Sequence, residues 1–242
     1  LLMETIPNFH NTRDRYAKLM TAVEANAAGR LEEVREDLEW LLSVQDLACK
    51  LTDMQKAGQL PLRVTHNDTK INNVLFERGG VAPLVVVDLD TVMSGYMAQD
   101  FGDAVRFACN TASEDETDLS LVSLDVERYR HLAQGFVTPL LGIVTKAELQ
   151  SLPVGILVIT LELASRFLTD YLSGDVYFKC TKAKHNLFRA KCQLALAKDI
   201  SSKTQKFSAE LDVDTIDGAV VKNFIWKNTE AIEPITAVQS VL

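Results

Sequence analysis

Residues 64–76 read VTHNDTKINNVLF, in which two short apolar runs enclose a polar stretch with the pattern HxDxxxxN. A further apolar run leads directly into Asp88, and the turn signal Gly79-Gly80 stands before it. Apolar, β-branched runs of this length, bounded by turn residues, are typical of strands. The pattern therefore predicts three short strands, at 63–65, 73–76 and 84–87.

The rest of the chain up to about residue 200 has apolar residues at helical spacing. Thr12 is the expected N-cap of a first helix, and Gly58 is the expected end of a second, longer one. The apolar positions of the second helix are Leu31, Val34, Leu38, Leu41, Leu42, Leu47, Leu51 and Met54. Further helices are expected near 100–112, 125–141, 146–173 and 184–200. The expected fold class is α+β and mostly helical, with a small central β element that carries the polar loop.

Composition and charge describe a soluble globular chain. Of its 242 residues, 47% are apolar and 24% are charged, which is enough apolar content for a core and too little charge for disorder. The net charge of −8 argues against a general nucleic-acid binder. The four cysteines are scattered without a CxxC pair, so the sequence indicates neither a disulfide framework nor a zinc ribbon.

The sequence predicts no targeting signal and no membrane segment. The chain begins with the letters LLME, without the basic region of a secretory signal. The apolar run at 154–160 is followed closely by Glu162 and Arg166, so it falls short of the roughly 18 apolar residues that a membrane span needs. A buried helix is expected there instead. Together these features favour a cytoplasmic location.

The polar residues around HxDxxxxN match the needs of phosphoryl transfer from a nucleotide. A carboxylate must orient the attacking hydroxyl and accept its proton, and Asp68 is the candidate for this base. Asn73 and Asp88 are the candidates for holding Mg²⁺ against the phosphates of ATP. Lys70 is placed to neutralise charge on the transferred group, and His66 is expected to orient the loop by hydrogen bonds. The alternative is a polar turn between strands.

A resemblance to a known superfamily is carried by three separated blocks in order: HNDTKINNVLF, VVVDLDTVMSGYMAQDFGDAVRF and RFLTDYLSGDVYFK. They resemble the aminoglycoside phosphotransferase/choline kinase superfamily, and within it the N-acetylhexosamine 1-kinase branch, as does the opening ETIPNFHNTRDRY. The resemblance implies that residues 1–200 form the C-terminal, catalytic lobe of a protein kinase-like fold, followed by an unassigned tail at 201–242. It also implies ATP- and Mg²⁺-dependent phosphorylation of a sugar hydroxyl, the anomeric one of an N-acetylhexosamine, with Asp68 as base and Asn73 and Asp88 as metal ligands.

Candidates for sugar binding come from the outer blocks of this resemblance. Arg166, Asp170, Tyr171 and Asp175 lie in the third block, where carboxylates and an aromatic ring suit a hydroxyl-rich substrate. The alternative is a surface ion pair between Arg166 and Asp170, which are one helical turn apart. His10 in the opening segment is a further candidate, and its alternative is a structural histidine.

The letters DFG at 100–102 spell the metal motif of protein kinases, but they begin 27 residues past the loop asparagine, so Asp88 is assigned to the metal instead. In the superfamily an aspartate after the metal strand braces the catalytic loop. By that resemblance Asp100 or Asp103 is expected in this role, with Arg106 as an ion partner.

The sequence departs from the superfamily before residue 60, where it has neither a glycine-rich loop nor a β-strand lysine for the nucleotide phosphates. Half of the ATP site is therefore expected outside this chain, which looks like a piece of a longer protein. One alternative is a catalytically incompetent lobe that binds only a sugar or a partner.

A second alternative is a haloacid dehalogenase-like phosphatase. Residues 85–92 also spell hhhDxDxT, in which Asp88 would be the nucleophile and Asp90 the acid and base. In the kinase interpretation, the sequence leaves three alternatives for the Asp90 side chain: contact with a metal, contact with a substrate or a hydrogen bond to a nearby backbone amide. The expected partners are a sugar and a nucleotide, with no nucleic acid and no membrane, and the sequence defines no oligomeric state.

Overall fold

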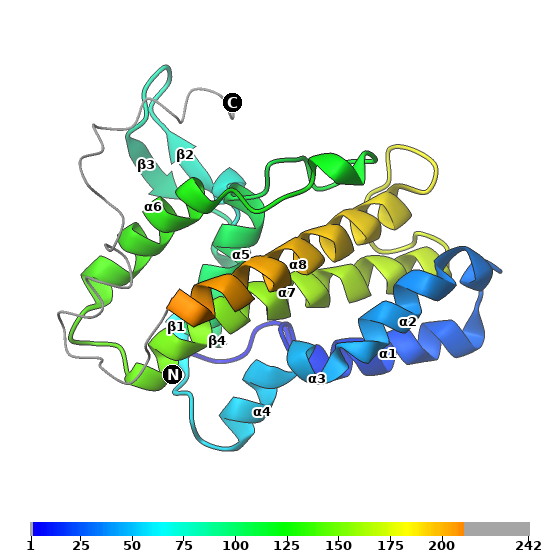
Figure 1. The fold of residues 1–242 in the computed structure, drawn as a ribbon, viewed down its shortest axis with the longest axis horizontal. Helices are drawn as coiled ribbons and strands as arrows, with labels where there is room; N and C mark the ends of the chain where they lie inside the picture. The colour runs from blue at the N-terminus through cyan, green and yellow to red at the C-terminus, as the bar shows by residue number, and fades with distance from the viewer. Residues whose placement is uncertain (1, 211–242) are drawn as a thin grey trace.

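The computed structural model describes residues 2–210, of which 204–210 by backbone alone. The helices are α1 (Thr12–Ala25), α2 (Arg35–Ser43), α3 (Gln45–Ala48), α4 (Lys50–Lys56), α5 (Met97–Ala108), α6 (Val126–Val137), α7 (Lys146–Ser173) and α8 (His185–Glu210). Short 3-10 turns are η1 (Leu31–Val34), η2 (Ile71–Asn73), η3 (Leu89–Thr91), η4 (Leu119–Leu121) and η5 (Thr138–Leu140). In Figure 1 α7 and α8 lie side by side at the centre, and α1 and α5 also pack on α7.

The predicted mostly helical α+β class is confirmed, and the helices expected after the β element correspond to α5, α6, α7 and α8. The last of these is longer than expected. Residues 201–210 continue α8, so the unassigned tail predicted at 201–242 begins within this helix and otherwise lies outside the described residues.

The β element consists of two antiparallel pairs. One pair joins β1 (Arg63–Thr65) to β4 (Met93–Gly95), and the other is the hairpin of β2 (Val74–Phe76) and β3 (Pro83–Val86). The three predicted strands are confirmed. β4 was not predicted, because its three residues have no β-branched side chain and so give no strand signal. The loop with HxDxxxxN connects β1 to β2, so the two pairs hold it at both ends.

The strand arrangement also tests the phosphatase alternative. That interpretation requires β3 to open an α/β domain with strands and helices alternating after it. Within residues 2–210 both strand pairs are antiparallel, and the chain beyond β4 is helical apart from one isolated bridge between Asn110 and Leu124. The strand that leads to Asp88 lies in a hairpin, so the architecture does not fit a phosphatase of this class.

The second predicted helix is wrong as a single element. The chain forms η1, α2, α3 and α4 in succession, with breaks at Val44 and Cys49, where ψ is 14° and 0°. These bends keep the apolar stripe on the core, because Leu41 and Leu51, on either side of the breaks, are both fully buried. Packing against α7 therefore overrides the continuous helical period of the sequence.

The ends of the first helices are set by local hydrogen bonds. Asn11, and not the predicted Thr12, is the N-cap of α1, because its side chain accepts a hydrogen bond from the amide of Asp14. Thr12 is the first helical residue, and its hydroxyl donates to the buried Glu162 at 2.9 Å. Gly58 follows α4 with φ of +69°, as expected of a glycine after a helix end.

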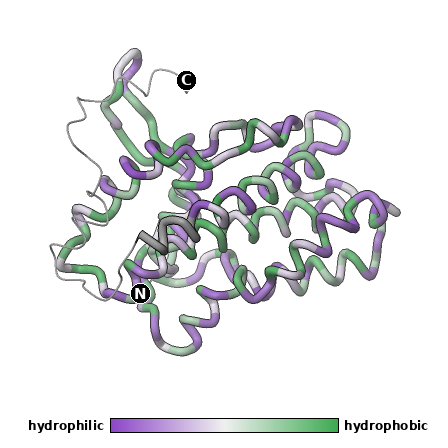
Figure 2. The backbone as a smooth tube through the Cα atoms, viewed as in Figure 1, coloured by the Kyte–Doolittle hydropathy of each residue, from purple (hydrophilic) through white to green (hydrophobic). Residues whose placement is uncertain are grey.

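Helix α7 is the centre of the core. By length and composition it is sufficient to cross a membrane, contrary to the expectation from the run at 154–160 alone, but 72% of its most apolar window is buried within the fold. Hydrophobic residues run along the central helices in Figure 2, and Val158 and Leu168 of α7 are fully buried. The predicted buried helix is therefore confirmed.

The contact of α5 with α7 depends on two glycines. A Cβ added at Gly155 would lie 2.0 Å from the carbonyl oxygen of Ala98, and one added at Gly102 would lie 2.4 Å from the carbonyl oxygen of Gly155. Only a residue without a side chain permits two backbones to approach this closely. The crossing fixes the position of α5, whose first turn contacts the HxDxxxxN loop.

Replacing Gly155 with alanine is expected to lower the free energy of unfolding by about 1–3 kcal/mol, because the added methyl overlaps rigid backbone. Gly135→Ala in α6, where nothing lies within 4 Å, is the matched control and is expected to raise it by about 0.5–1 kcal/mol. Urea unfolding followed by circular dichroism measures both changes. Similar shifts for the two variants would contradict the close crossing.

Candidate active site

The HxDxxxxN loop brings three of the predicted residues together. The side-chain amide of Asn73 donates to the backbone oxygen of Asp68 at 2.8 Å and to its Oδ2 at 3.0 Å. The ammonium of Lys70 lies 2.9 Å from Oδ1 of the same carboxylate. Because the NH₂ group of Asn73 is used internally, its carbonyl oxygen remains available as a ligand for a cation.

His66 connects this loop to the end of β3. Its Nδ1 accepts a hydrogen bond from the amide of Asp68 at 3.3 Å, and its Nε2 lies 3.0 Å from the carbonyl oxygen of Val87. A neutral ring with the proton on Nε2 satisfies both contacts, as assigned from these partners. This is the geometry of an orienting residue, as the sequence analysis expects for His66.

The loop is also held from α5 by a half-buried carboxylate. Asp100 accepts the backbone amides of His66 at 2.8 Å and Asn67 at 2.7 Å, and its carbonyl oxygen accepts the hydroxyl of Thr69 at 2.6 Å. Burial raises the pKa of Asp100, although the two amides partly offset that effect. Of the two aspartates expected to brace the loop, Asp100 has these contacts. Arg106 pairs instead with Asp103.

Asn67, which was not predicted as a site residue, anchors the loop from the other side. Its φ is +65°, a left-handed conformation that asparagine adopts more readily than most residues. Its side-chain amide donates to the backbone oxygen of Thr91 at 3.0 Å, and its Oδ1 accepts the hydroxyl of Thr65 at 2.9 Å. The asparagine directly before the candidate base was the available signal for this role.

Asp88 and Asp90 place two carboxylates side by side after β3. A hydrogen bond to Asp90, the charge of Asp90 and the charge of Asp68 raise the pKa of Asp88, whereas the bond to Asp88 and a backbone amide lower the pKa of Asp90. A carboxylate whose charge is destabilised by a neighbouring carboxylate, as that of Asp88 is by Asp90, fits a divalent cation of opposite charge.

These donors fit Mg²⁺ when phosphate oxygens complete its coordination. Residues 2–210 contain no group of three or more His, Cys, Asp or Glu side chains that would bind a metal without other ligands. Mg²⁺ usually binds one or two carboxylates together with substrate phosphates and water. The Asp88 carboxylate and the free Asn73 oxygen match this requirement.

A cavity of about 370 Å³ lies beside the candidate base. Asp68 and Lys70 line it from the loop, His10 from the N-terminal segment, Arg166 from α7 and Tyr177 from the segment after α7. His10 and Arg166 are therefore the two predicted sugar-binding residues that share a cavity with Asp68. Tyr177 was missed, although it stands two residues past a candidate in the same sequence block.

The structure places Asp170, Tyr171 and Asp175 outside the lining of this cavity. Asp170 is 4% exposed and its carboxylate accepts three consecutive backbone amides, from Val176 to Phe178. Asp170 therefore shapes the segment after α7 and forms no surface ion pair with Arg166. The Arg166 guanidinium lies instead near the ring of Phe9, at 5.6 Å from its centroid, and near that of Phe178, at 5.4 Å.

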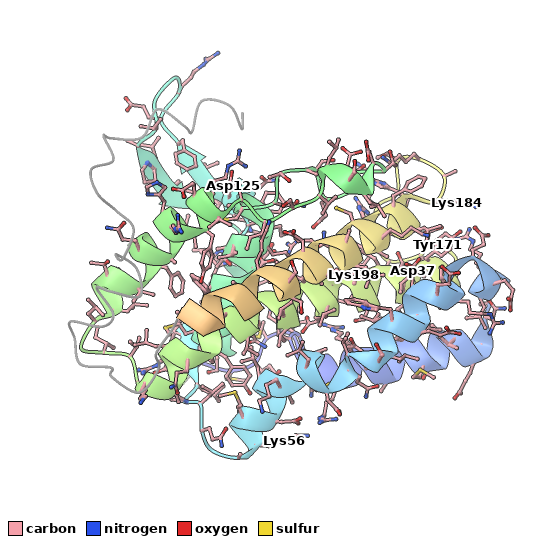
Figure 3. The ribbon with its side chains drawn as sticks, in the orientation of Figure 1. Asp37, Lys56, Asp125, Tyr171, Lys184 and Lys198 are labelled. Atoms are coloured by element: carbon pink, nitrogen blue, oxygen red, sulfur yellow. The ribbon has the colours of Figure 1, made fainter. Side chains whose placement is uncertain are left out.

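Tyr171 and Asp175 contact the N-terminal helices instead. The Tyr171 hydroxyl donates to Glu33 at 3.0 Å, and Lys184 reaches the same carboxylate at the same end of the molecule (Figure 3). Asp175 forms an ion pair with Arg30 at 2.5 Å. Both residues therefore join the end of α7 to the N-terminal helices.

His10 joins three parts of the fold through a buried ion pair. Its Nδ1 lies 2.8 Å from Glu162 of α7, and its Nε2 lies 2.9 Å from the carbonyl oxygen of Asn67 in the loop. Both partners are acceptors, so the ring carries two protons. Burial alone would lower the pKa of His10, but Glu162 raises it overall, and His10 in turn lowers the pKa of Glu162 against the effect of burial.

Residues 3–132 match the phosphotransferase enzyme family. The match covers more than half of the chain and includes the HxDxxxxN loop, the pair Asp88 and Asp90, and the bracing Asp100. The chain belongs to this family of phosphotransferases, in agreement with the resemblance to the aminoglycoside phosphotransferase/choline kinase superfamily.

The His10–Glu162 pair is expected to make stability depend on pH. His10 has a raised pKa, so its contribution is complete below the ordinary value of 6.5 and is lost as the pH rises through the folded-state pKa. Glu162 has a lowered pKa, so its contribution is complete above 4.5 and is lost as the pH falls through its folded-state pKa. The pair therefore stabilises the fold most between these two values.

His10→Gln leaves the buried Glu162 charge unpaired and is expected to cost about 3–5 kcal/mol of unfolding free energy at pH 6. The difference from the wild type is expected to be smaller at pH 9 than at pH 6, because the wild type loses the His10 proton as the pH rises through the raised folded-state pKa. Urea unfolding at the two pH values measures this change. A difference that is the same at both would exclude the ion pair as its cause.

Asp100→Asn removes one of the two acceptors that hold the loop. Hydrogen exchange of the amides of His66 and Asn67 is expected to accelerate roughly 10- to 100-fold, as loss of a hydrogen bond to a charged group predicts. Asp118→Asn is the control, since this exposed carboxylate also accepts a backbone amide, that of Ser120. Unchanged protection in Asp100→Asn would contradict the bracing role.

Proposed function

We propose that this phosphotransferase transfers the γ-phosphoryl group of ATP, with Mg²⁺, to a sugar hydroxyl, the anomeric one of an N-acetylhexosamine. The observation that carries the proposal is the cluster of Asp68, Asn73 and Asp88 beside a cavity of about 370 Å³. That volume lies within the range of small-molecule sites. A cytoplasmic location and a sugar and a nucleotide as partners belong to the same proposal.

In this reaction Asp68 is the base. The acceptor hydroxyl lies in the cavity and donates its proton to the Asp68 carboxylate while its oxygen forms the new bond to phosphorus, and ADP leaves with the electrons of the bond that breaks. Lys70 exchanges its contact with Asp68 for the transferred phosphoryl group. Asn73 and Asp88 would hold Mg²⁺, which would supply charge neutralisation on the phosphates.

Residues 1–200 are proposed as the C-terminal lobe of a protein kinase-like fold, with the rest of the ATP site on a segment beyond these residues. The exposed hairpin supports this division. Leu75, Leu84, Val85 and Val86 are 48–66% exposed, although strand residues of this kind are normally covered. The hairpin leads directly into Asp88, so a nucleotide-binding segment that covers it would also reach the metal.

The N-acetylhexosamine substrate is supported by the resemblance of the block at 166–179 and by the wall that it provides. Arg166 lies near two aromatic rings, and Tyr177 is 72% exposed beside it in the cavity lining. A wall with aromatic faces and polar tips suits a sugar ring, which has apolar faces and a polar edge.

A lobe that binds sugar without transferring phosphate is the second candidate. It is favoured by the described chain before β1, which is helical from Thr12 to Lys56 apart from short connections and so contains no β-strand lysine for a nucleotide. The two candidate functions differ only in whether phosphate is transferred to the sugar, because both retain the cavity.

Asp68→Asn is expected to reduce kcat by about 10²- to 10⁴-fold with little change in KM, because the variant keeps the shape of the base and loses its proton affinity. The assay follows formation of sugar phosphate by ³¹P NMR with ATP, Mg²⁺ and N-acetylglucosamine. It uses this chain and a chain extended by its upstream sequence. Transfer by the extended chain alone would support the division into lobes.

Equal product from Asp68→Asn and the wild type would exclude Asp68 as the base. Sugar binding without product in both chains would favour the second candidate. Asp118→Asn, which changes an exposed carboxylate outside the cavity, controls for the loss of charge.

A further inference from the structure

Four carboxylates line the cavity beside Asp68, and the contacts of their oxygens differ. They belong to Asp68, Asp103, Glu114 and Glu162. Both oxygens of Asp68 and both of Glu162 have partners within the protein. Glu114 accepts from Arg106 at 2.9 Å and is about one-third exposed to solvent. Asp103 is the exception, since it is buried and has one oxygen without a partner.

Asp103 is 6% exposed, and its Oδ1 accepts both Nε of Arg106 at 3.0 Å and Nη2 at 2.7 Å. Its Oδ2 is buried and has no hydrogen-bond partner among the described residues. A buried carboxylate oxygen without a donor is costly, so such groups normally receive a hydrogen bond from the protein or a ligand. Because Asp103 also lines the cavity, a molecule bound there could supply that donor.

The side chain of Asp103 is held in one orientation before any ligand arrives. Arg106 is itself fixed, because its Nη1 also contacts Glu114 at 2.9 Å and Gln193 of α8 at 3.3 Å. Asp103 lies one helical turn after Asp100 on α5, so the two carboxylates share one face of the helix. The helix that braces the loop of the base therefore also carries the unpartnered oxygen.

We propose that Asp103 Oδ2 accepts a hydrogen bond from a hydroxyl group of the acceptor, away from the hydroxyl that reacts, and so selects sugars that carry a hydroxyl at that position. The inference rests on the proposed function, which it extends by naming a specificity residue. Asp103 touches the substrate and takes no part in moving the proton.

The charge of the surroundings favours a neutral hydroxyl over an ammonium group. Lys70, Arg106, Arg166, Lys179 and Arg189 all line the cavity. These cations disfavour a positively charged acceptor, whereas the carboxylate oxygen itself disfavours an anion. A neutral hydroxyl donates to the carboxylate and avoids both costs. Loss of that hydroxyl leaves a buried acceptor unpaired, which is the strongest kind of discrimination a small pocket makes.

Asp103→Asn is the substitution that tests this oxygen. The amide keeps an oxygen for Arg106 and replaces the unpartnered acceptor by an NH₂ donor of the same size. Isothermal titration without nucleotide measures binding of N-acetylglucosamine and of its 3-deoxy, 4-deoxy and 6-deoxy analogues to the 242-residue chain. The variant is expected to bind N-acetylglucosamine roughly 10- to 100-fold more weakly than the wild type.

One of the deoxy analogues is expected to bind the wild type more weakly than N-acetylglucosamine does, by a similar factor. The same analogue is expected to bind Asp103→Asn with nearly the affinity that N-acetylglucosamine has for this variant. Such non-additivity identifies the hydroxyl that contacts Asp103. Asp115→Asn is the control variant, because this carboxylate pairs with Lys182 and His185 outside the cavity lining. It is expected to bind all the sugars as the wild type does.

The outcomes separate this inference from the function on which it rests. Equal affinity of Asp103→Asn and the wild type, or losses that add for every analogue, would overturn the role of Asp103 and leave the proposed function standing. Failure of the wild type to bind any of the sugars would overturn both. Should the variant not fold, as thermal unfolding would reveal, wild-type affinities that are equal for all three deoxy analogues would also overturn the inference.

Discussion

The half-buried carboxylate of Asp100 is the contact on which the position of the candidate base depends. It accepts the amides of two consecutive residues, His66 and Asn67, so the loop is tied to the first turn of α5 directly before Asp68. Such a carboxylate is stable in the interior because backbone donors replace the water that it loses. Helix α5 is in turn fixed on α7 by the close approach at Gly155, so the geometry of the loop follows from the packing of the core.

The acidic residues around the cavity differ in how many of their carboxylate oxygens have a partner within the protein. Glu162 is occupied by His10 and Thr12, and Asp170, behind the cavity wall, by backbone amides, so these two carboxylates are structural. The neighbouring Asp90 raises the pKa of Asp88 and so destabilises its charge, and Asp103 keeps one oxygen without a donor. In the proposed function these are the carboxylates that a cation or a substrate would contact.

Sequence reasoning succeeded where a feature depends on neighbours along the chain. The three predicted strands follow from local periodicity, and the turn signal at Gly79-Gly80 lies between the two strands of the hairpin. It failed where distant packing intervened. The long helix expected to end at Gly58 is broken at Val44 because the chain bends to keep its apolar residues on the core.

By itself the sequence determined the residue types of the HxDxxxxN loop, the strand that leads to Asp88 and the family of phosphotransferases to which the chain belongs. Only the tertiary structure decided which polar residues remain free to bind. Asp170 looked available in sequence but is enclosed by a segment that folds back on it, whereas Asp103 looked like a brace but lines the cavity and keeps one oxygen unpaired. The physical reason is that hydrogen-bond satisfaction depends on partners far apart in the chain, such as His10 and Glu162, and their proximity exists only in the folded state.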